Sequence, residues 1–371
     1  MKQPPRSLCS LPPEVACQSL GTARRADMQR RTFSAALGTM LVAASMPAPS
    51  WAQSRPAFIR APRLKPGDTI ALINPSGALF EREPYAVAGE TLRALGFKVR
   101  EAPNLRARYG HLAGTDRQRA DDVNAMFADP GVQGLLAMSG GAGGNRMLAL
   151  VDYELIQRTP KFLGGHADLT GLINAVYTRT GLVTFHAPMG NSEWNPFTVD
   201  HFKRAVIDAE PMTLATPRGE GESLVPRDGR VTTLRGGTAR GLLIGGNLSA
   251  LAAMAGSPYW PRFDGSILLL EEHDELIHRI DRALATLRLA GAFSRLAGVV
   301  IGAFADCTPG KGYAALTLDE LFDDYFKALN IPVFRGAQFG QVARKFTLPI
   351  GLPAEMDAGA GTLRFLGPAV A

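Results

Sequence analysis

The sequence predicts an α/β fold, with an N-terminal parallel-sheet domain over about 64–207 and a smaller C-terminal α+β domain over about 238–367. From Leu64 onward, short apolar runs alternate strictly with amphipathic segments, which is typical of a parallel sheet covered on both faces. The stretch 208–237 between the two halves is rich in proline, glycine and charge and has no helical period. We interpret it as a linker, and the short strands and few helices beyond it favour the α+β class.

The elements of the first half follow from local hydrophobic patterns. Apolar runs predict strands at 69–77, 97–103, 134–141, 161–165 and 182–188. Amphipathic segments predict helices at 81–95, 117–127, 145–155 and 168–178. Gly96 is expected to close the first of these helices, because glycine commonly follows the last helical residue.

The second half resumes with the apolar, glycine-containing run 241–256. Beyond it, strands are expected at 266–275 and 297–304, and helices at 275–289 and 316–329. Late strands are expected at 331–336, 345–351 and 361–367. The sequence contains no internal repeat and no low-complexity tract.

Residues 1–52 have the features of an upstream extension followed by a twin-arginine export signal. Arg30 and Arg31 precede a short alanine-rich apolar run, and small residues end the segment where a signal peptidase would cut. The run is too short and too weakly apolar to remain as a stable membrane anchor. The sequence therefore predicts a periplasmic protein that starts near Gln53. The start of translation stays open between the first methionine and Met28.

Charge and cysteine content exclude several classes of function. Residues 1–52 carry six of the 40 basic and two of the 34 acidic residues, so the formal net charge falls from +6 to +2 on their removal. This leaves no electrostatic argument for nucleic-acid binding. Cys307 is the only cysteine of the mature chain, which rules out an internal disulfide and a cysteine metal cluster. We expect no metal and no cofactor.

Two glycine-containing loops follow predicted strands. The first is N-P-S-G at 74–77, which includes Ser76 and reads equally well as an ordinary turn. The second, S-G-G-A-G-G-N-R-M-L at 139–148, opens a predicted helix and leaves several backbone amides uncovered. Such amides form a site for a carboxylate or an oxyanion. The residues expected to form this site are Ser139, Gly140, Gly141 and Gly143. The spacing matches neither a dinucleotide-binding fingerprint nor a P-loop.

Two further loops carry residues of interest. F-L-G-G-H-A-D-L-T-G at 162–171 is a strand-to-helix turn of the nucleophile-elbow type, and Ala167 stands at its apex. The next amide, from Asp168, is expected to point to the same place, while the Asp168 side chain is expected to cap its own helix. A leucine-rich strand delivers Glu271 and Glu272, although two acids after a strand are usually solvated.

These loops together resemble the serine LD-carboxypeptidases, also called muramoyltetrapeptide carboxypeptidases, and the related microcin-immunity peptidases. The resemblance spans about 67–367. It rests on G-D-T-I-A-L-I-N-P-S-G, the glycine-rich loop, F-L-G-G-H-A-D-L-T, T-F-H-A-P-M, G-G-N-L, L-E-E, F-G-Q and T-L-P-I-G, in that order. Several spaced motifs in the right order are far more specific than any one of them.

The resemblance implies a two-domain protein in which a serine works with a glutamate and a histidine. The glutamate position matches, as Glu271, but Ala167 occupies the serine position and Gln341 the histidine position. The family's R-G-G-Y-G is S-G-G-A-G here, at 139–143. The resemblance implies that the ligand is a peptidoglycan stem peptide or muropeptide, from which the family removes the terminal D-alanine. We expect Glu271 to accept a hydrogen bond from the Gln341 side-chain amide instead of orienting a histidine.

Two classes of function remain open at the level of sequence. One is a ligand-binding or regulatory protein that has lost the family's catalytic residues, since alanine is no nucleophile and glutamine does not titrate. The other is a hydrolase with a rearranged site. Its nucleophile would be Ser139, served by a histidine base, or Glu271 would act alone as a general acid on glycan. The candidate bases are His166, His186 and His273. Homodimer formation is also left open.

Overall fold

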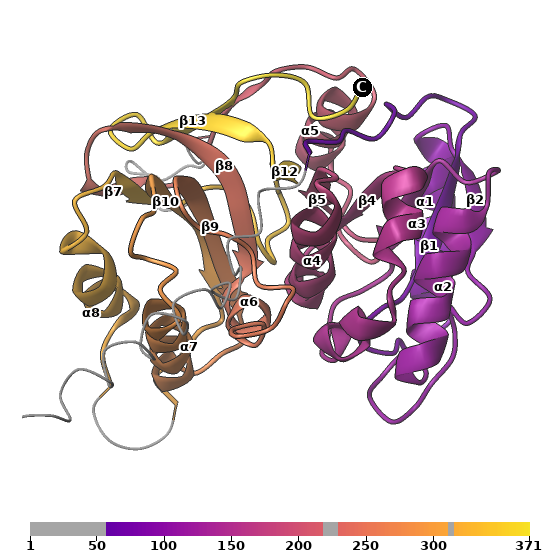
Figure 1. Cartoon of the computed structure of the whole chain (residues 1–371), viewed down its shortest axis with the longest axis horizontal. Helices are drawn as coiled ribbons and strands as arrows, with labels where there is room; N and C mark the ends of the chain where they lie inside the picture. Colours follow the sequence, from indigo (N-terminus) through magenta and orange to yellow (C-terminus); the bar gives the residue numbers. More distant parts are fainter. Residues whose placement is uncertain (1–56, 218–228, 311–314) are drawn as a thin grey trace, which may run out of the picture. The chain divides into compact units, whose positions relative to one another are not determined.

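The computed structural model describes residues 57–217, 229–310 and 315–371 (Figure 1). The predicted twin-arginine signal, with Arg30, Arg31 and the expected mature start at Gln53, lies outside these residues. In the described ranges, no helix is long and apolar enough to cross a membrane.

The first half forms a six-stranded sheet in the order β12-β5-β4-β3-β1-β2. Its strands are β1 (Thr69–Ile73), β2 (Lys98–Glu101), β3 (Gly134–Ala137), β4 (Phe162–Gly165), β5 (Thr184–His186) and β12 (Leu348–Ile350). Strands β1 to β5 are parallel, which confirms the predicted class, whereas β12 pairs antiparallel with β5. The prediction that residues 345–351 belong to the C-terminal domain was therefore wrong for β12. Its fully buried Leu348 and Ile350 pack in the core beside β5.

Seven helical segments accompany this sheet in the described residues. They are α1 (Glu83–Ala94), α2 (Asp116–Ala128), η2 (Gly144–Leu150), α3 (Tyr153–Arg158), η3 (Ala167–Leu169), α4 (Thr170–Thr180) and α5 (Pro196–Val206). The helix expected at 145–155 is divided, because Val151 has extended backbone angles and Asp152 caps a new helix through the Leu155 amide. Helix α5 was not predicted, although Asn195 caps it and a proline opens it.

The second half forms an eight-stranded mixed sheet in the order β6-β14-β13-β8-β9-β10-β11-β7. Its strands are β6 (Thr213–Ala215), β7 (Thr232–Arg235), β8 (Thr238–Asn247), β9 (Ser266–His273), β10 (Gly298–Ala305), β11 (Val333–Arg335), β13 (Pro353–Asp357) and β14 (Thr362–Phe365). In the described residues, neighbouring strands pair parallel from β8 to β11, and the other neighbouring pairs of this sheet are antiparallel. The expected linker at 208–237 contributes β6 and β7 to this sheet, so it is not simply a connection. These two edge strands were not predicted, because the sequence of this stretch alternates with polar residues.

Four helical segments belong to the second half among the described residues: α6 (Leu248–Ala252), α7 (Ile277–Leu289), α8 (Leu318–Phe322) and the π-helical turn η4 (Asp323–Lys327). The α-helix expected at 316–329 is therefore shorter than predicted, and it continues as the π-helical turn η4. Thr317 and Glu320 form a capping box at its start.

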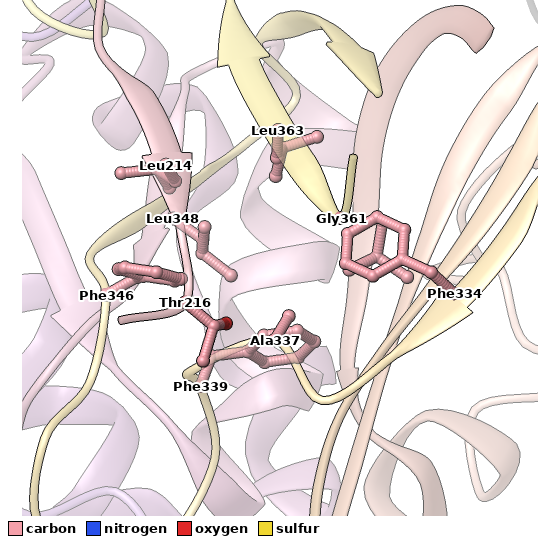
Figure 2. A pocket seen from close by; sticks show the side chains of 10 residues that line it. Leu214, Thr216, Phe334, Ala337, Phe339, Phe346, Leu348, Gly361 and Leu363 are labelled. Atoms are coloured by element: carbon pink, nitrogen blue, oxygen red, sulfur yellow. The ribbon is translucent and has the colours of Figure 1, made fainter. Parts of the chain in front are cut away.

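A small cavity of about 10 Å³, with room for roughly one water molecule, is lined by residues of the eight-stranded sheet and of the segment that leads into β12. Figure 2 shows that aromatic and aliphatic side chains, including Phe334, Phe339 and Leu363, surround it. Its one hydroxyl, on Thr216, already donates a hydrogen bond to the carbonyl of Gly336. This cavity is a packing defect in the core and has no features of a ligand site.

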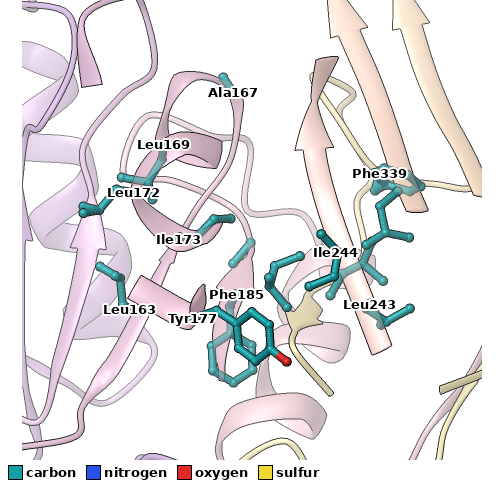
Figure 3. Packing of buried hydrophobic residues seen from close by; sticks show 14 of the residues in the cluster. Leu163, Ala167, Leu169, Leu172, Ile173, Tyr177, Phe185, Leu243, Ile244 and Phe339 are labelled. Carbon is teal, nitrogen blue, oxygen red and sulfur yellow. The ribbon is translucent and has the colours of Figure 1, made fainter. Parts of the chain in front are cut away.

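The two halves share one hydrophobic core. Figure 3 shows Ile173 and Tyr177 of α4 in one cluster of buried side chains with Leu243 and Ile244 of β8. Buried hydrogen bonds join the same elements, since Asn174 both donates to the Gly245 carbonyl at 2.9 Å and accepts from its amide at 3.1 Å. Helix α4 is thereby fixed between the halves.

The G-G-N-L motif fits tightly against α4. A Cβ at Gly246 would lie 2.6 Å from the Thr170 hydroxyl, and one at Gly245 would lie 2.2 Å from the Leu269 carbonyl oxygen. The amide of Asn247 donates to the Thr170 hydroxyl at 2.9 Å. Both glycines have positive φ angles, so no other residue fits this junction without displacing it.

Candidate active site

Residues from both halves line an open cleft of about 810 Å³. Its lining residues lie in the segments 77–80, 139–142, 189–193 and 341–345, joined by His111 and His166. The cleft therefore unites three features that lie far apart in the sequence: the first loop, the glycine-rich loop and the F-G-Q segment. The first and the last of them are more than 260 residues apart. A volume of this size is typical of a ligand site.

Ala167 stands at the apex of the turn after β4, with a φ angle of 53°. This left-handed conformation is uncommon for a residue with a Cβ and is a strained feature found mainly at functional positions. Gly165, two residues earlier, admits no side chain, since a Cβ there would lie 2.4 Å from the Leu169 side chain. The turn therefore has the backbone of a nucleophile elbow, and its apex carries a methyl group.

Gly140 packs directly on this apex. A Cβ at Gly140 would lie 2.8 Å from the Ala167 methyl group and 3.8 Å from the Asp168 amide nitrogen. Gly141, with a φ angle of 111°, packs in the same way on the backbone of Gly77. The glycine-rich loop therefore lies in direct contact with both the elbow and the first loop.

Asp168 stabilises the glycine-rich loop. Its carboxylate accepts a hydrogen bond from the Gly144 amide at 2.6 Å, at the start of η2. The prediction that it caps its own helix was wrong, because α4 begins after an intervening 3₁₀ turn and has no side-chain cap. Burial raises the pKa of Asp168, while the Gly144 amide and the Ser76 hydroxyl oppose that shift. Ser76 is fully buried beneath the loop and does not line the cleft.

Arg119 of α2 holds the first two loops together, and sequence reasoning missed it. Its guanidinium is 1% exposed and donates to the carbonyls of Pro75, at 2.5 Å, and Gly143, at 2.8 Å. Burial lowers its pKa, and the partly buried Asp116 beside it opposes the shift. An arginine among the buried positions of an amphipathic helix was the available signal.

Ser139 lines the cleft but has a local hydrogen-bonding role. Its hydroxyl donates to Asn74 Oδ1 at 3.2 Å and to the Gly77 carbonyl at 3.3 Å. In the described part of the chain no histidine is hydrogen-bonded to it. Ser139 therefore braces the glycine-rich loop against the first loop.

Glu271 lies at the end of β9 and is fully buried. Its nearest charged or titratable contact is His186 of β5, whose Nε2 lies 3.5 Å from Oε1, and neither atom has a hydrogen-bond partner. The expected hydrogen bond from Gln341 is absent, because the side chain of Gln341 faces the cleft. Instead the backbone of Gly340 covers Glu271, where a Cβ would lie 3.0 Å from Oε2.

Glu272 is buried as well, so the expectation of a solvated acidic pair was wrong. Its carboxylate accepts from the Asn247 side chain at 2.6 Å and from the Ser249 amide at 2.9 Å. Burial raises its pKa, and these hydrogen bonds counteract the shift. Glu272 therefore fixes the start of α6 and does not reach the cleft.

The three candidate histidine bases have different surroundings. His166 lines the cleft, is 2% exposed, and donates from Nδ1 to the Ala187 carbonyl at 3.0 Å. Burial, followed by the positive charge of Lys345, lowers the pKa of His166 well below its usual value, so the ring is neutral. His186 is buried against Glu271. Nδ1 of His273 lies 3.7 Å from Oδ2 of Asp306, and His273 does not line the cleft.

Lys345 is the second residue that sequence reasoning missed. It lines the cleft beyond Gln341 and is 5% exposed. Burial lowers its pKa to about 8, and the negative charges of Glu271 and Glu193 oppose that shift. Lys345 stands at the start of an expected strand, and nothing in the local pattern marks it as buried.

In the described ranges, no group of three or more histidine, cysteine, aspartate or glutamate side chains is arranged to hold a metal ion. The polar groups that line the cleft include neutral His166, Gln341, Lys345 and the backbone of the glycine-rich loop.

Comparison with known proteins agrees with this arrangement. Residues 70–187 match the LD-carboxypeptidase N-terminal domain and residues 240–356 match the LD-carboxypeptidase C-terminal domain. A probable murein peptide carboxypeptidase of Bacillus subtilis (strain 168) is 34% identical over 304 residues, which cover 81% of this chain and 92% of that protein.

Solved structures show the same fold. An MccF-like protein from Bacillus anthracis str. Ames is similar with a TM-score of 0.75 and 28% identity, covering 83% of this chain and 99% of that one. A muramoyltetrapeptide carboxypeptidase from Oxalobacter formigenes has a TM-score of 0.68 and 26% identity, covering 82% and 100%. By sequence and by fold, this chain belongs to the LD-carboxypeptidase family.

Proposed function

We propose that this protein is an exported member of the LD-carboxypeptidase family that binds peptidoglycan stem peptides without hydrolysing them by the family's serine mechanism. The observation that carries the proposal is Ala167, which occupies the strained apex of an intact nucleophile elbow. Members of the family are named for action on murein peptides and muramoyl tetrapeptide. The cleft of about 810 Å³ is large enough for a peptide of this class.

The chemistry at the elbow supports the loss of hydrolysis. Attack on an amide needs an oxygen or sulfur nucleophile and a base that takes up and returns a proton near neutral pH. Ala167 offers no such atom, and Gln341 does not titrate. Loss of a complete catalytic unit of this kind costs roughly a millionfold in turnover, whereas an oxyanion site retains roughly a thousandfold over water.

The rearranged-hydrolase alternative finds little support. Ser139 is engaged with Asn74 and Gly77, so its hydroxyl lacks a base. Glu271 is fully buried and does not line the cleft, so it has no path to a glycosidic oxygen. A general acid has to lie within hydrogen-bond reach of the atom that it protonates.

Export is part of the proposal and rests on the sequence of residues 1–52 alone. Replacement of both Arg30 and Arg31 by lysine is expected to trap the precursor in the cytoplasm, as measured by fractionation and immunoblotting. The unsubstituted precursor is the control. Normal export of the double-lysine variant would refute the twin-arginine route and leave the binding proposal untouched.

Binding and hydrolysis are separated by one experiment on the chain beginning at Gln53. The protein is mixed with a disaccharide tetrapeptide, and binding heat and free D-alanine are followed in parallel. We expect measurable binding with no release of D-alanine above that of a heat-denatured sample. Release that disappears in Ser139→Ala would establish the rearranged hydrolase, and the absence of binding would refute the proposed ligand.

A further inference from the structure

We propose that Lys345 binds the free terminal carboxylate of the peptide that occupies the cleft. This inference deepens the proposed function and rests on it for the identity of the peptide. The side chain combines near-complete burial, a position in the cleft wall and the absence of a hydrogen-bonded partner, which together mark a site for an anion.

The burial of Lys345 is only partly compensated within the protein, by the negative charges of Glu271 and Glu193. The residue is 5% exposed, yet no carboxylate in the described ranges forms an ion pair with its ammonium group and no acceptor takes a hydrogen bond from it. The buried Lys161, in contrast, donates to the carbonyls of Met126 and Asp129. A buried charge without a partner is costly, so the arrangement favours a bound anion that supplies one.

The backbone around Lys345 is held in place. Its amide donates to the Thr198 hydroxyl at 3.3 Å, and the Asn195 side chain donates to the Ala343 carbonyl at 2.9 Å. The next amide, of Phe346, donates to the Gln338 carbonyl at 2.7 Å. These contacts hold the segment against the start of α5. The backbone from which the Lys345 side chain extends therefore has a fixed position.

Lys345 is also the only lysine or arginine in the lining of the cleft, among the residues that the structure describes. The remaining basic groups of the lining are His111 and His166, and His166 is neutral because burial lowers its pKa. The ammonium group of Lys345 is therefore the one lysine or arginine charge that the described lining presents to an anionic ligand. The amides of the glycine-rich loop supply weaker, uncharged donors.

The position of Lys345 in the cleft is suited to binding the terminal carboxylate of a peptide. In a peptide whose last bond lies at the elbow, the terminal carboxylate is one residue, about 3.5 Å, beyond the carbonyl at that bond. Lys345 acts electrostatically on His166, the residue directly before Ala167, so its charge lies near the elbow. The exposed Glu193 and the buried Glu271 are the negative groups that also act on Lys345, and both favour its protonated form.

The test compares two ligands that differ only at the terminus: the disaccharide tetrapeptide and the same molecule with a C-terminal carboxamide. Binding to wild type and Lys345→Gln is measured by calorimetry, with the exposed Lys98→Gln as the matched control. We expect Lys345→Gln to weaken binding of the acid about 10- to 100-fold and to leave binding of the amide unchanged. Lys98→Gln should change neither. Equal binding of the acid by wild type and Lys345→Gln, or equal loss for acid and amide, would overturn the proposal.

A second probe keeps this inference separate from the proposed function. N-acetyl-D-alanine and N-acetyl-D-alaninamide are titrated into each protein and followed by NMR. Binding of the acid that Lys345→Gln abolishes, in a protein that ignores the tetrapeptide, would support Lys345 and refute the murein ligand. Failure of wild type to bind either acid would overturn the role of Lys345. Thermal melting verifies that Lys345→Gln is folded.

Discussion

Gly140 lies so close to Ala167 that a Cβ at position 140 would come within 2.8 Å of the alanine methyl group. The glycine-rich loop and the elbow therefore form one continuous surface. The protein has kept this surface, including the strained φ angle of 53°, without the hydroxyl that such a turn presents.

Gly140→Ala is expected to disrupt ligand binding, because the added methyl group forces the loop away from the elbow. We expect the affinity for the disaccharide tetrapeptide to fall at least about 10-fold, measured by calorimetry, as overpacking of this kind costs about 1–3 kcal/mol. Gly236→Ala is the matched control, since a Cβ there has no atom within 4 Å. Unchanged affinity in Gly140→Ala would show that the ligand does not use the loop.

Arg119→Met is expected to lower the free energy of unfolding by about 3 kcal/mol, because it leaves the buried carbonyls of Pro75 and Gly143 without a donor. Urea denaturation measures this change. Arg117→Met on the same helix removes a side chain that is 76% exposed and should cost less than about 0.5 kcal/mol. Similar losses in the two variants would contradict the bracing role of Arg119.

Lys345 is expected to make stability depend on alkaline pH in a defined direction. Its pKa is lowered to about 8 in the folded protein from 10.5, so between these values the unfolded chain binds more protons than the folded one. The contribution of Lys345 to the free energy of unfolding therefore rises with pH across this window. The buried charge costs up to about 3 kcal/mol below pH 8, and this cost is relieved above it.

Lys345→Met isolates this contribution from other titrating groups, such as Cys307, whose pKa burial raises to about 11. We expect the variant to be more stable than wild type at pH 7 and the difference to shrink by pH 10, as measured by urea denaturation. A difference that is constant over this range would show that Lys345 titrates normally.

Much of the fold could be predicted from the sequence, because the parallel strands are continuous apolar runs and their helices are amphipathic. The strands β6 and β7 could not be predicted, because exposed edge strands carry polar residues and resemble a linker. The pairing of β12 with β5 was also beyond reach, because it joins segments more than 160 residues apart. Such pairing depends on tertiary packing rather than local pattern.

The candidate site was predicted in outline. The motif at 162–171 contains the elbow, and its glycines mark the close backbone contacts that the structure shows. The roles of Arg119 and Lys345 could not be predicted, because burial of a cation is decided by segments distant in sequence. The expected partner of Glu271, Gln341, followed from the family resemblance, whereas in the structure His186 of the neighbouring sheet lies beside Glu271.

The central claim is that this is a serine-peptidase site from which the nucleophile and the base are missing. It is tested most directly by D-alanine release from the disaccharide tetrapeptide by four proteins: wild type, Ala167→Ser, Gln341→His and the double variant. The account predicts release by the double variant alone, since a hydroxyl without a base is unreactive and the two groups act as one unit. Release by Ala167→Ser equal to that of the double variant, or a double variant that binds the peptide and releases nothing, would contradict it.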